Sequence, residues 1–352
     1  MKVCLLGDTH FGIRNDSMTF HRYLDKFYTE VFFPYLKEHD IKTVIQLGDL
    51  FDRRKYINFV SLSESRRYFF DRLKDEGIHL HALIGNHDIF WKNSLEVNSP
   101  DLLLKDYDNI TLWQNPGQLI LDGSSFDMIP WICKNNQEEI FNFVNRSLSS
   151  YCIGHFELAG FQLMKGVQSF DGMDSGFLDK YDSVFSGHYH TQSEVGNIKY
   201  LGTPYELFWS DHKDPKGFFI FDTETQDIEF IQNKNAMFHK IMYDDNDGPM
   251  DIDYLQFSET YVKIVVVNKQ NPYLFDKMLD ELYKVNPAHL AVIEDYGDDS
   301  FENIDSELID QAEDTLTILS NYIDQQGVDV DSNKLKNLMR ELYVEALAQE
   351  TI

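Results

Sequence analysis

A repeated pattern limits the folds open to this chain: five short apolar runs each end in Asp, Asn or His. In the clearest case, the run 44–47 is followed by Gly48-Asp49 and, three residues later, by Asp52. A buried parallel strand that delivers a carboxylate at its carboxyl end is a common source of ligand-binding side chains in an α/β protein. The run therefore indicates a strand that ends at a binding site.

The other four runs share this design. They end in Asp8-Thr9-His10, in Gly85-Asn86-His87-Asp88, in His155 and in Gly187-His188-Tyr189-His190. Each one, taken singly, is more often a capped loop or a turn than a binding site. Together they supply carboxylate, amide and imidazole donors without a thiolate, which suits Mn²⁺, Fe²⁺, Mg²⁺ or Zn²⁺. Because parallel strands bring their carboxyl ends to one edge of a sheet, we expect the five sets to converge on a metal centre.

The spacing of apolar residues gives the order of the surrounding elements. In the first 84 residues we expect strands at 1–7, 43–47 and 79–84 and helices at 17–37 and 61–77. This β-α-β-α-β order predicts a largely parallel sheet with right-handed crossovers.

Further strands and one helix follow in the next part of the chain. We expect short strands within 109–130, a helix at 137–148, strands at 150–154 and 183–186, hairpin strands of a second sheet at 198–201 and 217–221, and a strand at 227–232. The predicted fold class is α/β, a two-sheet β-sandwich flanked by helices, with the metal centre where the strand ends meet.

The sequence changes in character near residue 238. We assign residues 1–237 to one domain and 238–293 to a small α+β cap domain, built from strands at 261–268 and 289–294 around a helix at 271–284. Residues 294–305 contain several acidic residues and no lysine or arginine, which is typical of a solvated linker.

The remaining segment, 306–352, has the spacing of two amphipathic helices. Its apolar side chains near one face include Leu335, Leu338, Met339 and Leu342. Such helices either pack on their own domain or dock on a partner protein. Attachment through a linker favours docking at a distance.

Composition adds three limits. The net charge of −28 argues that this chain alone binds nucleic acid poorly, although bound cations would neutralise part of the acidic excess. The three cysteines, Cys4, Cys133 and Cys152, lack ligand spacing and are expected to be reduced core residues of a cytoplasmic protein. No apolar run approaches the ~20 residues of a membrane span, so no membrane association is expected.

The ordered motifs resemble those of the calcineurin-like metallophosphoesterase family. The matching residues are Asp8-x-His10, Gly48-Asp49-x-x-Asp52, Gly85-Asn86-His87-Asp88, His155 and Gly187-His188-x-His190. A second set, Gly202-Thr203-Pro204-Tyr205-Glu206-Leu207 followed by Lys216-Gly217-Phe218, is similar to the SbcD-type nuclease subunits of double-strand-break repair complexes, bacteriophage members included. Asp52 stands where some nucleases of this type carry His.

The resemblance implies roles for individual residues. One cation would be held by Asp8, His10, Asp49 and His190, and the other by Asp49, Asn86, His155 and His188, with Asp49 bridging the two. His87 would protonate the leaving oxygen and Asp52 would orient it. Asp88 is expected to be structural. The basic stretch Arg53, Arg54 and Lys55 is either a solvated loop or a contact with the DNA backbone.

The expected function is a two-metal DNA exonuclease and endonuclease within a recombination and double-strand-break repair complex. Mn²⁺ is the expected cation, with Mg²⁺ as the alternative, and the cap domain at 238–293 is expected to bind DNA. The resemblance implies two protein partners, an SbcC-type coiled-coil ATPase and a second copy of this chain, joined through the helices at 17–37 or 61–77. For a phage-encoded chain, the compartment would be the host cytoplasm. The alternatives are a phosphatase or cyclic-nucleotide phosphodiesterase of the same superfamily, and a scaffold that has lost catalysis.

Overall fold

The computed structural model describes residues 1–164, 167–170 and 172–294. The residues assigned to docking, Leu335, Leu338, Met339 and Leu342, lie outside the described residues, as does the linker after residue 294. Met1–Leu207 and Asp211–Val292 belong to one compact unit. The boundary at 237/238 stays a prediction.

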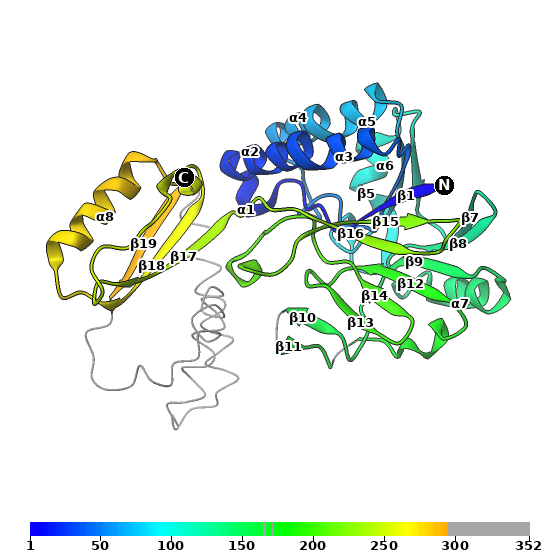
Figure 1. The fold of residues 1–352 in the computed structure, drawn as a ribbon. Helices are drawn as coiled ribbons and strands as arrows, with labels where there is room; N and C mark the ends of the chain where they lie inside the picture. Colours follow the sequence, from blue (N-terminus) through cyan, green and yellow to red (C-terminus); the bar gives the residue numbers. More distant parts are fainter. Residues whose placement is uncertain (165–166, 171, 295–352) are drawn as a thin grey trace. The chain divides into compact units, whose positions relative to one another are not determined.

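The first sheet holds the amino-terminal strands (Figure 1). Its order is β16 (Ile228–Gln232), β15 (Gly217–Asp222), β1 (Lys2–Leu6), β2 (Thr43–Gln46), β3 (His79–Leu83) and β6 (Ile110–Trp113). The neighbours from β1 to β6 pair in parallel, as the sequence predicts, whereas β15 and β16 run antiparallel to the strands beside them. The carboxyl ends of β1, β2 and β3 therefore meet at one edge.

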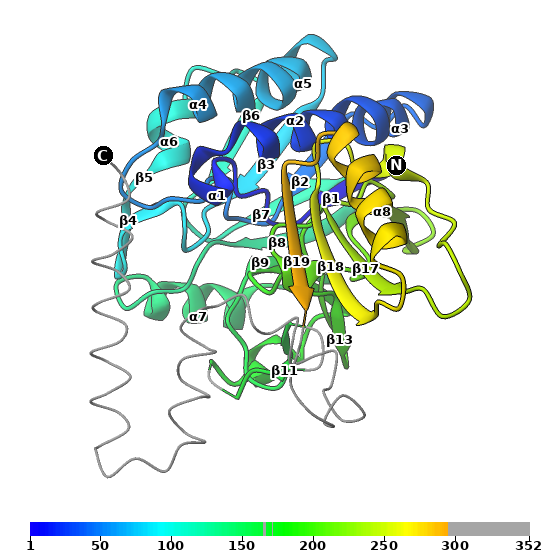
Figure 2. The same ribbon diagram turned by 90° about the vertical axis from the view of Figure 1, so that its left-hand side faces the viewer.

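Two long helical segments lie over one face of this sheet in both ribbon views (Figure 2). They consist of α2 (Met18–Phe27) and α3 (Phe33–Glu38) around a π-helical turn at Tyr28–Phe32, and of α4 (Phe59–Ser65) and α5 (Asp71–Asp75) around a π-helical turn at Arg66–Phe70. The turns face each other, because the rings of Tyr28 and Tyr68 stack with centroids 5.5 Å apart. The predicted helices are confirmed, each with a π-helical turn inside it.

The second sheet carries the later histidines. Its order is β13 (Ser193–Val195), β14 (Ile198–Tyr200), β12 (Ser183–Gly187), β9 (Tyr151–His155), β8 (Ser124–Ile129) and β7 (Gly117–Leu121). Side chains such as Val3 and Ile45 of the first sheet pack against Phe126 and Ile153 of the second, so the core lies between the sheets. The predicted two-sheet arrangement is confirmed.

One predicted pairing is wrong. Residues 198–201 and 217–221 do not form hairpin strands of one sheet, because β14 pairs with β13 and β12, whereas β15 pairs with β1 and β16. The segment between them passes from one sheet to the other. Gly7 fits against the carbonyl of Gly202 there, where a Cβ on Gly7 would clash. Both strands are apolar, and alternation alone does not say which sheet a strand joins.

Residues 238–294 form a small α/β layer. It contains β17 (Phe238–Asp244), β18 (Tyr261–Asn268) and β19 (His289–Glu294), with α8 (Pro272–Lys284) packed on the sheet through Phe275, Met278 and Leu282. The Asn271 side chain caps α8 by accepting a hydrogen bond from the amide of Tyr273. The expected strand–helix–strand order is confirmed, with β17 added parallel to β18.

The remaining described elements are short. They are α1 (Ile13–Asp16), β4 (Ile89–Trp91), β5 (Ser94–Asn98), α6 (Ser99–Leu104), α7 (Gln137–Arg146), β10 (Gln162–Met164), β11 (Val167–Gln168) and 3₁₀ turns at Ser175–Leu178, Trp209–Asp211 and Tyr254–Phe257. Cys4, Cys133 and Cys152 are free and buried, as predicted. In the described part of the chain, no helix is long and apolar enough to cross a membrane.

Candidate metal centre

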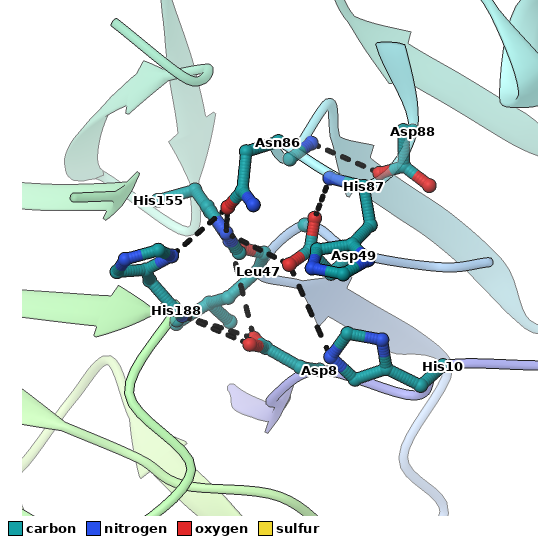
Figure 3. Close-up of polar contacts among 12 residues, drawn as sticks. Asp8, His10, Leu47, Asp49, Asn86, His87, Asp88, His155 and His188 are labelled. Atoms are coloured by element: carbon teal, nitrogen blue, oxygen red, sulfur yellow. Dashed lines mark hydrogen bonds and ion pairs between the residues drawn. The ribbon is translucent and has the colours of Figure 1, made fainter. Parts of the chain in front are cut away.

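The predicted ligands converge at the strand carboxyl ends (Figure 3). Three groups of side chains each bring their ligand atoms within 4.8 Å of one another: Asp8, His10 and His190; Asp49, His155 and His188; and His10, Asp52 and His87. The amide of Asn86 joins the second group. Residues that are far apart in the chain thus share one site.

In the first group, imidazole nitrogens face each other. Nε2 of His10 lies 3.1 Å from Nε2 of His190, and Oδ2 of Asp8 lies 3.9 Å from the same His190 nitrogen. His10 and Asp8 are buried, whereas the His190 side chain is partly exposed. Two members of the group are therefore buried, and the third, His190, is partly open to solvent.

In the second group, Oδ1 of Asn86 is the centre of contacts. It lies 3.0 Å from Nε2 of His155 and 2.9 Å from Nδ1 of His188. Nδ1 of His155 contacts the main-chain oxygen of Leu47 at 2.7 Å. A carbonyl accepts, so Nδ1 carries a proton and Nε2 is the nitrogen that a bound cation would take.

Asp49 lies between the two groups. Its Oδ2 is 3.2 Å from Nε2 of His155 and 4.0 Å from Nε2 of His10. A carboxylate can bridge two cations through its oxygens, whereas an imidazole presents one lone pair at a time. Asp49 thus approaches donors of both groups, and its bridging role stays a prediction.

Three of the predicted ligands have backbone angles in the left-handed region: φ is 44° at His10, 53° at Asp49 and 90° at His188. Such angles are uncommon for residues other than glycine and cluster at functional sites. Space is also limited, because a Cβ on Gly187 would stand 2.5 Å from Oδ1 of Asp8 and one on Gly85 would clash with Asp49. The glycines beside the ligands are thus sterically required.

Buried polar groups brace the ligand loops. Asp88 accepts hydrogen bonds from the main-chain amides of Gly85, Leu50 and Phe51, which agrees with its expected structural role. Two further bracing contacts, those of Gln46 and Tyr205, were not predicted from the sequence. The side chain of Gln46 contacts the carbonyl and the amide of Gly48, and the hydroxyl of Tyr205 donates to the carbonyl of Thr9 at 2.6 Å.

The charges in the site are strongly coupled. Burial, together with the charge of Asp49, raises the pKa of Asp8 to about 7. Burial also opposes ionisation of Asp49, but the adjacent His155 outweighs it and holds the pKa of that carboxyl below its usual range. Burial disfavours a charged His155, yet Asp49 and Asp8 raise its pKa to about 9. The two carboxylates therefore create a site that attracts positive charge.

These residues fit divalent cations. Within the described residues, neither buried carboxylate, Asp8 or Asp49, has a lysine or arginine ion pair; their partners are imidazoles that are themselves metal-type donors. Hard oxygen and borderline nitrogen donors in this number suit Mn²⁺, Fe²⁺, Mg²⁺ or Zn²⁺.

His87 and Asp52 lie beside the ligands in an arrangement that the sequence did not predict. Nδ1 of His87 contacts the main-chain oxygen of Asp52 at 2.6 Å. The Asp52 carboxylate instead lies 3.3 Å from Nδ1 of His10. Burial lowers the pKa of His87. Asp52 thus meets His87 through its backbone and His10 through its side chain.

The basic stretch Arg53, Arg54 and Lys55 lines a cavity of about 230 Å³ together with apolar side chains that include Phe59 and Leu102. Arg53 is not a freely solvated side chain, because it donates to Asn15 at 2.6 Å and pairs with Asp16 at 3.4 Å. The guanidinium of Arg53, the residue after Asp52, is thus held in place by Asn15 and Asp16.

An aromatic side chain that sequence reasoning missed lies next to the site. The ring of Trp131 packs against His188 and His155, with centroids 5.2 and 5.9 Å apart. Its main-chain amide donates to the carbonyl of Ile84, at the end of the strand before Asn86. No ligand pattern marks Trp131 in the sequence.

Two buried carboxylates, one amide and four imidazoles gathered at the edges of two facing sheets are the site of a metal-dependent hydrolase. The family model for calcineurin-like phosphoesterases matches residues 1–266, and the chain belongs to this family. It is also 37% identical over 348 residues to exonuclease subunit 1 of Enterobacteria phage T4, a match that covers 98% of this chain and 99% of that protein.

Two solved structures have a lower similarity. A novel archaeal phosphodiesterase is 14% identical with a TM-score of 0.34, covering 66% of this chain and 100% of its own. A hypothetical protein from Thermus thermophilus is 13% identical with a TM-score of 0.36, covering 66% of this chain and 97% of its own.

Proposed function

We propose that this chain is the nuclease subunit of a recombination and double-strand-break repair complex, and that it hydrolyses DNA phosphodiesters as an exonuclease and endonuclease. One observation carries the proposal. Six other donors converge around Asp49 in a chain that is similar over nearly its whole length to a protein named exonuclease subunit 1.

The ligand assignment is the one that the family resemblance implies, and the clustering of the donors supports it. Asp8, His10, Asp49 and His190 would hold one divalent cation, and Asp49, Asn86, His155 and His188 the other, with Mn²⁺ favoured and Mg²⁺ as the alternative. Two cations held by these residues would neutralise phosphate charge and lower the pKa of an attacking water. The neutral amide and imidazole ligands leave part of the cation charge unbalanced, so the site attracts a phosphodiester.

His87 supplies the proton step in this proposal. Its Nδ1–H donates to the main-chain oxygen of Asp52, which leaves Nε2 for the substrate. The charge of a bound phosphodiester favours the imidazolium form, which can protonate the leaving oxygen. Asp52 holds the ring in place through its backbone, and its carboxylate orients His10.

The basic stretch Arg53, Arg54 and Lys55 would contact the DNA backbone. Arg53 is held by Asn15 and Asp16, and Arg54 and Lys55 line the same cavity. The chain as a whole carries a charge of −28, which opposes DNA binding. A partner that supplies further positive charge fits this balance.

That partner is proposed to be an SbcC-type coiled-coil ATPase, docked on residues 306–352 through Leu335, Leu338, Met339 and Leu342. The name of the T4 relative, a numbered subunit, supports an assembly. Deleting all residues after Asp305 should abolish co-purification with the ATPase while the shortened chain keeps its bound manganese. Co-purification of the shortened chain would overturn the docking assignment.

A second copy of the chain is the other proposed partner. Exposed apolar side chains gather at the start of α4 and beside it, where Tyr56, Phe59, Val60 and Leu102 are 48–87% exposed. A cluster of this kind is typical of a protein–protein interface. Of the two helices expected to join the dimer, the one at 61–77 is therefore preferred.

The rival enzyme function is a phosphatase or a cyclic-nucleotide phosphodiesterase. Purified chain should be assayed with Mn²⁺ on linear duplex DNA, single-stranded DNA and bis-p-nitrophenyl phosphate. Cleavage of DNA supports the nuclease. Hydrolysis of the small ester without DNA cleavage, even after the ATPase subunit is added, would overturn it in favour of the rival.

A further inference from the structure

Lys216 is a buried lysine with a complete set of partners. Its side chain is 3% exposed. Nζ donates at 2.8 Å to three oxygens: Oδ1 of Asp211, Oδ2 of Asp214 and the main-chain oxygen of His190. An ammonium group has three N–H donors, so every donor of Lys216 is used.

One of these acceptors belongs to a proposed metal ligand. The carbonyl of His190 also accepts the main-chain amide of Thr203 at 3.1 Å. Gly202 packs against the same oxygen, because a Cβ there would stand 2.8 Å from it. The backbone of His190 is therefore held by a charged donor, an amide and a steric contact, although its side chain is the most exposed of the first group.

The cost of burying Lys216 indicates what the contact does. Buried lysines are rare unless paired, and a group of three buried charges is seldom worth more to stability than apolar packing. Here Asp211 also accepts the amide of Leu207 at 2.7 Å, which ties the cluster to the segment whose Tyr205 braces Thr9. The cluster is thus connected to the first group at two places: directly at the backbone of His190, and through the segment of Tyr205 at Thr9, between Asp8 and His10.

We propose that Lys216 is a positioning residue that fixes the backbone of His190 so that its imidazole completes the cation site of Asp8, His10 and Asp49. The inference rests on the proposed metal assignment and adds to it a residue with no contact to the cation. Partners one step outside a metal site typically change its affinity about 10–100-fold. Only the first of the two sites should depend on Lys216.

The test is manganese binding, measured by isothermal titration and electron paramagnetic resonance. Because Lys216→Met leaves the carboxylates of Asp211 and Asp214 buried without their cationic partner, a variant with a neutral cluster, Lys216→Met/Asp211→Asn/Asp214→Asn, accompanies it. Both should lose one Mn²⁺ per chain, or bind it about 10–100-fold more weakly, and the coupled two-ion signal should give way to that of an isolated ion. His190→Ala should show the same pattern.

A matched control is Lys42→Met. Nζ of Lys42 also donates to a main-chain oxygen, that of Glu76 at 3.2 Å, but at the opposite end of the strands. This variant should bind two Mn²⁺ like the wild type. If the neutral-cluster variant binds two ions with unchanged affinity, the positioning role of Lys216 is overturned and the metal assignment is not. Failure of the wild type to bind a pair would overturn the metal assignment itself.

Discussion

The main-chain amide of His87 donates a 2.6 Å hydrogen bond to Oδ1 of Asp49. This contact joins the proposed bridging carboxylate to the backbone of the proposed proton donor. The bond belongs to the peptide unit, so the His87 side chain can be removed without disturbing it. Metal binding and proton transfer are therefore separable by substitution.

His87→Ala should keep both manganese ions and lose about 10²–10⁴-fold in cleavage rate, the usual contribution of a general acid. Metal content is measured on the purified protein and the rate on linear DNA at saturating Mn²⁺. His39→Ala, at an exposed histidine, is the control and should cleave like the wild type. Loss of a manganese ion from the His87 variant would move this residue into the ligand set.

Asp52→Asn should act mainly through the metal, because the Asp52 carboxylate lies 3.3 Å from Nδ1 of His10 and only its backbone contacts His87. We expect about 10–100-fold weaker binding of one cation and cleavage that recovers as Mn²⁺ is raised. Cleavage that stays low at saturating Mn²⁺, with unchanged affinity, would show instead that the carboxylate serves the proton step.

Phe59→Asp should weaken self-association, because Phe59 is 87% exposed within the apolar cluster at the start of α4. Placing a charge in a buried interface should raise the dimer dissociation constant by about tenfold or more, as measured by analytical ultracentrifugation. Leu148→Asp is the matched control, since Leu148 is 95% exposed beside α7. Equal association of the two variants would argue against this surface.

Stability should fall in mild acid through His81. Burial, together with the charge of His79, lowers the pKa of His81 to about 4. Between pH 6.5, the ordinary pKa of histidine, and pH 4, His81 binds more protons in the unfolded chain than in the folded chain. Stability is therefore lost as the pH falls through this window. The loss at pH 5 is about 2 kcal/mol from this residue. The free energy of unfolding is measured with urea at pH 8 and pH 5, and His81→Gln should reduce the difference between the two values by that amount. An unchanged difference would contradict the role given to His81.

The positions of the proposed metal ligands could be predicted because their signal is local. An apolar run followed by Asp, Asn or His identifies a strand and its carboxyl end, and Asp49 and His155 lie where that reasoning places them. The parallel order of β1, β2 and β3 follows from the helices between them.

The contacts between distant loops could not be predicted. Asp52 meets His10 because its amide bonds to the carbonyl of Phe11, which folds one ligand loop across another. Membership of the Lys216-Gly217-Phe218 motif does not mark Lys216 as buried, since a lysine that follows Asp214 and Pro215 in the sequence is typical of a surface turn. The crossing between the two sheets after Tyr200 likewise depends on packing.

The most direct test of the central proposal is cleavage of linear DNA with Mn²⁺ by the wild type and by Asp49→Ala, with the ATPase subunit present. Because Asp49 lies between both groups of donors, its loss should remove both cations and all detectable cleavage, while Lys42→Met retains wild-type activity. Cleavage by Asp49→Ala at the wild-type rate would contradict the two-metal nuclease at this site.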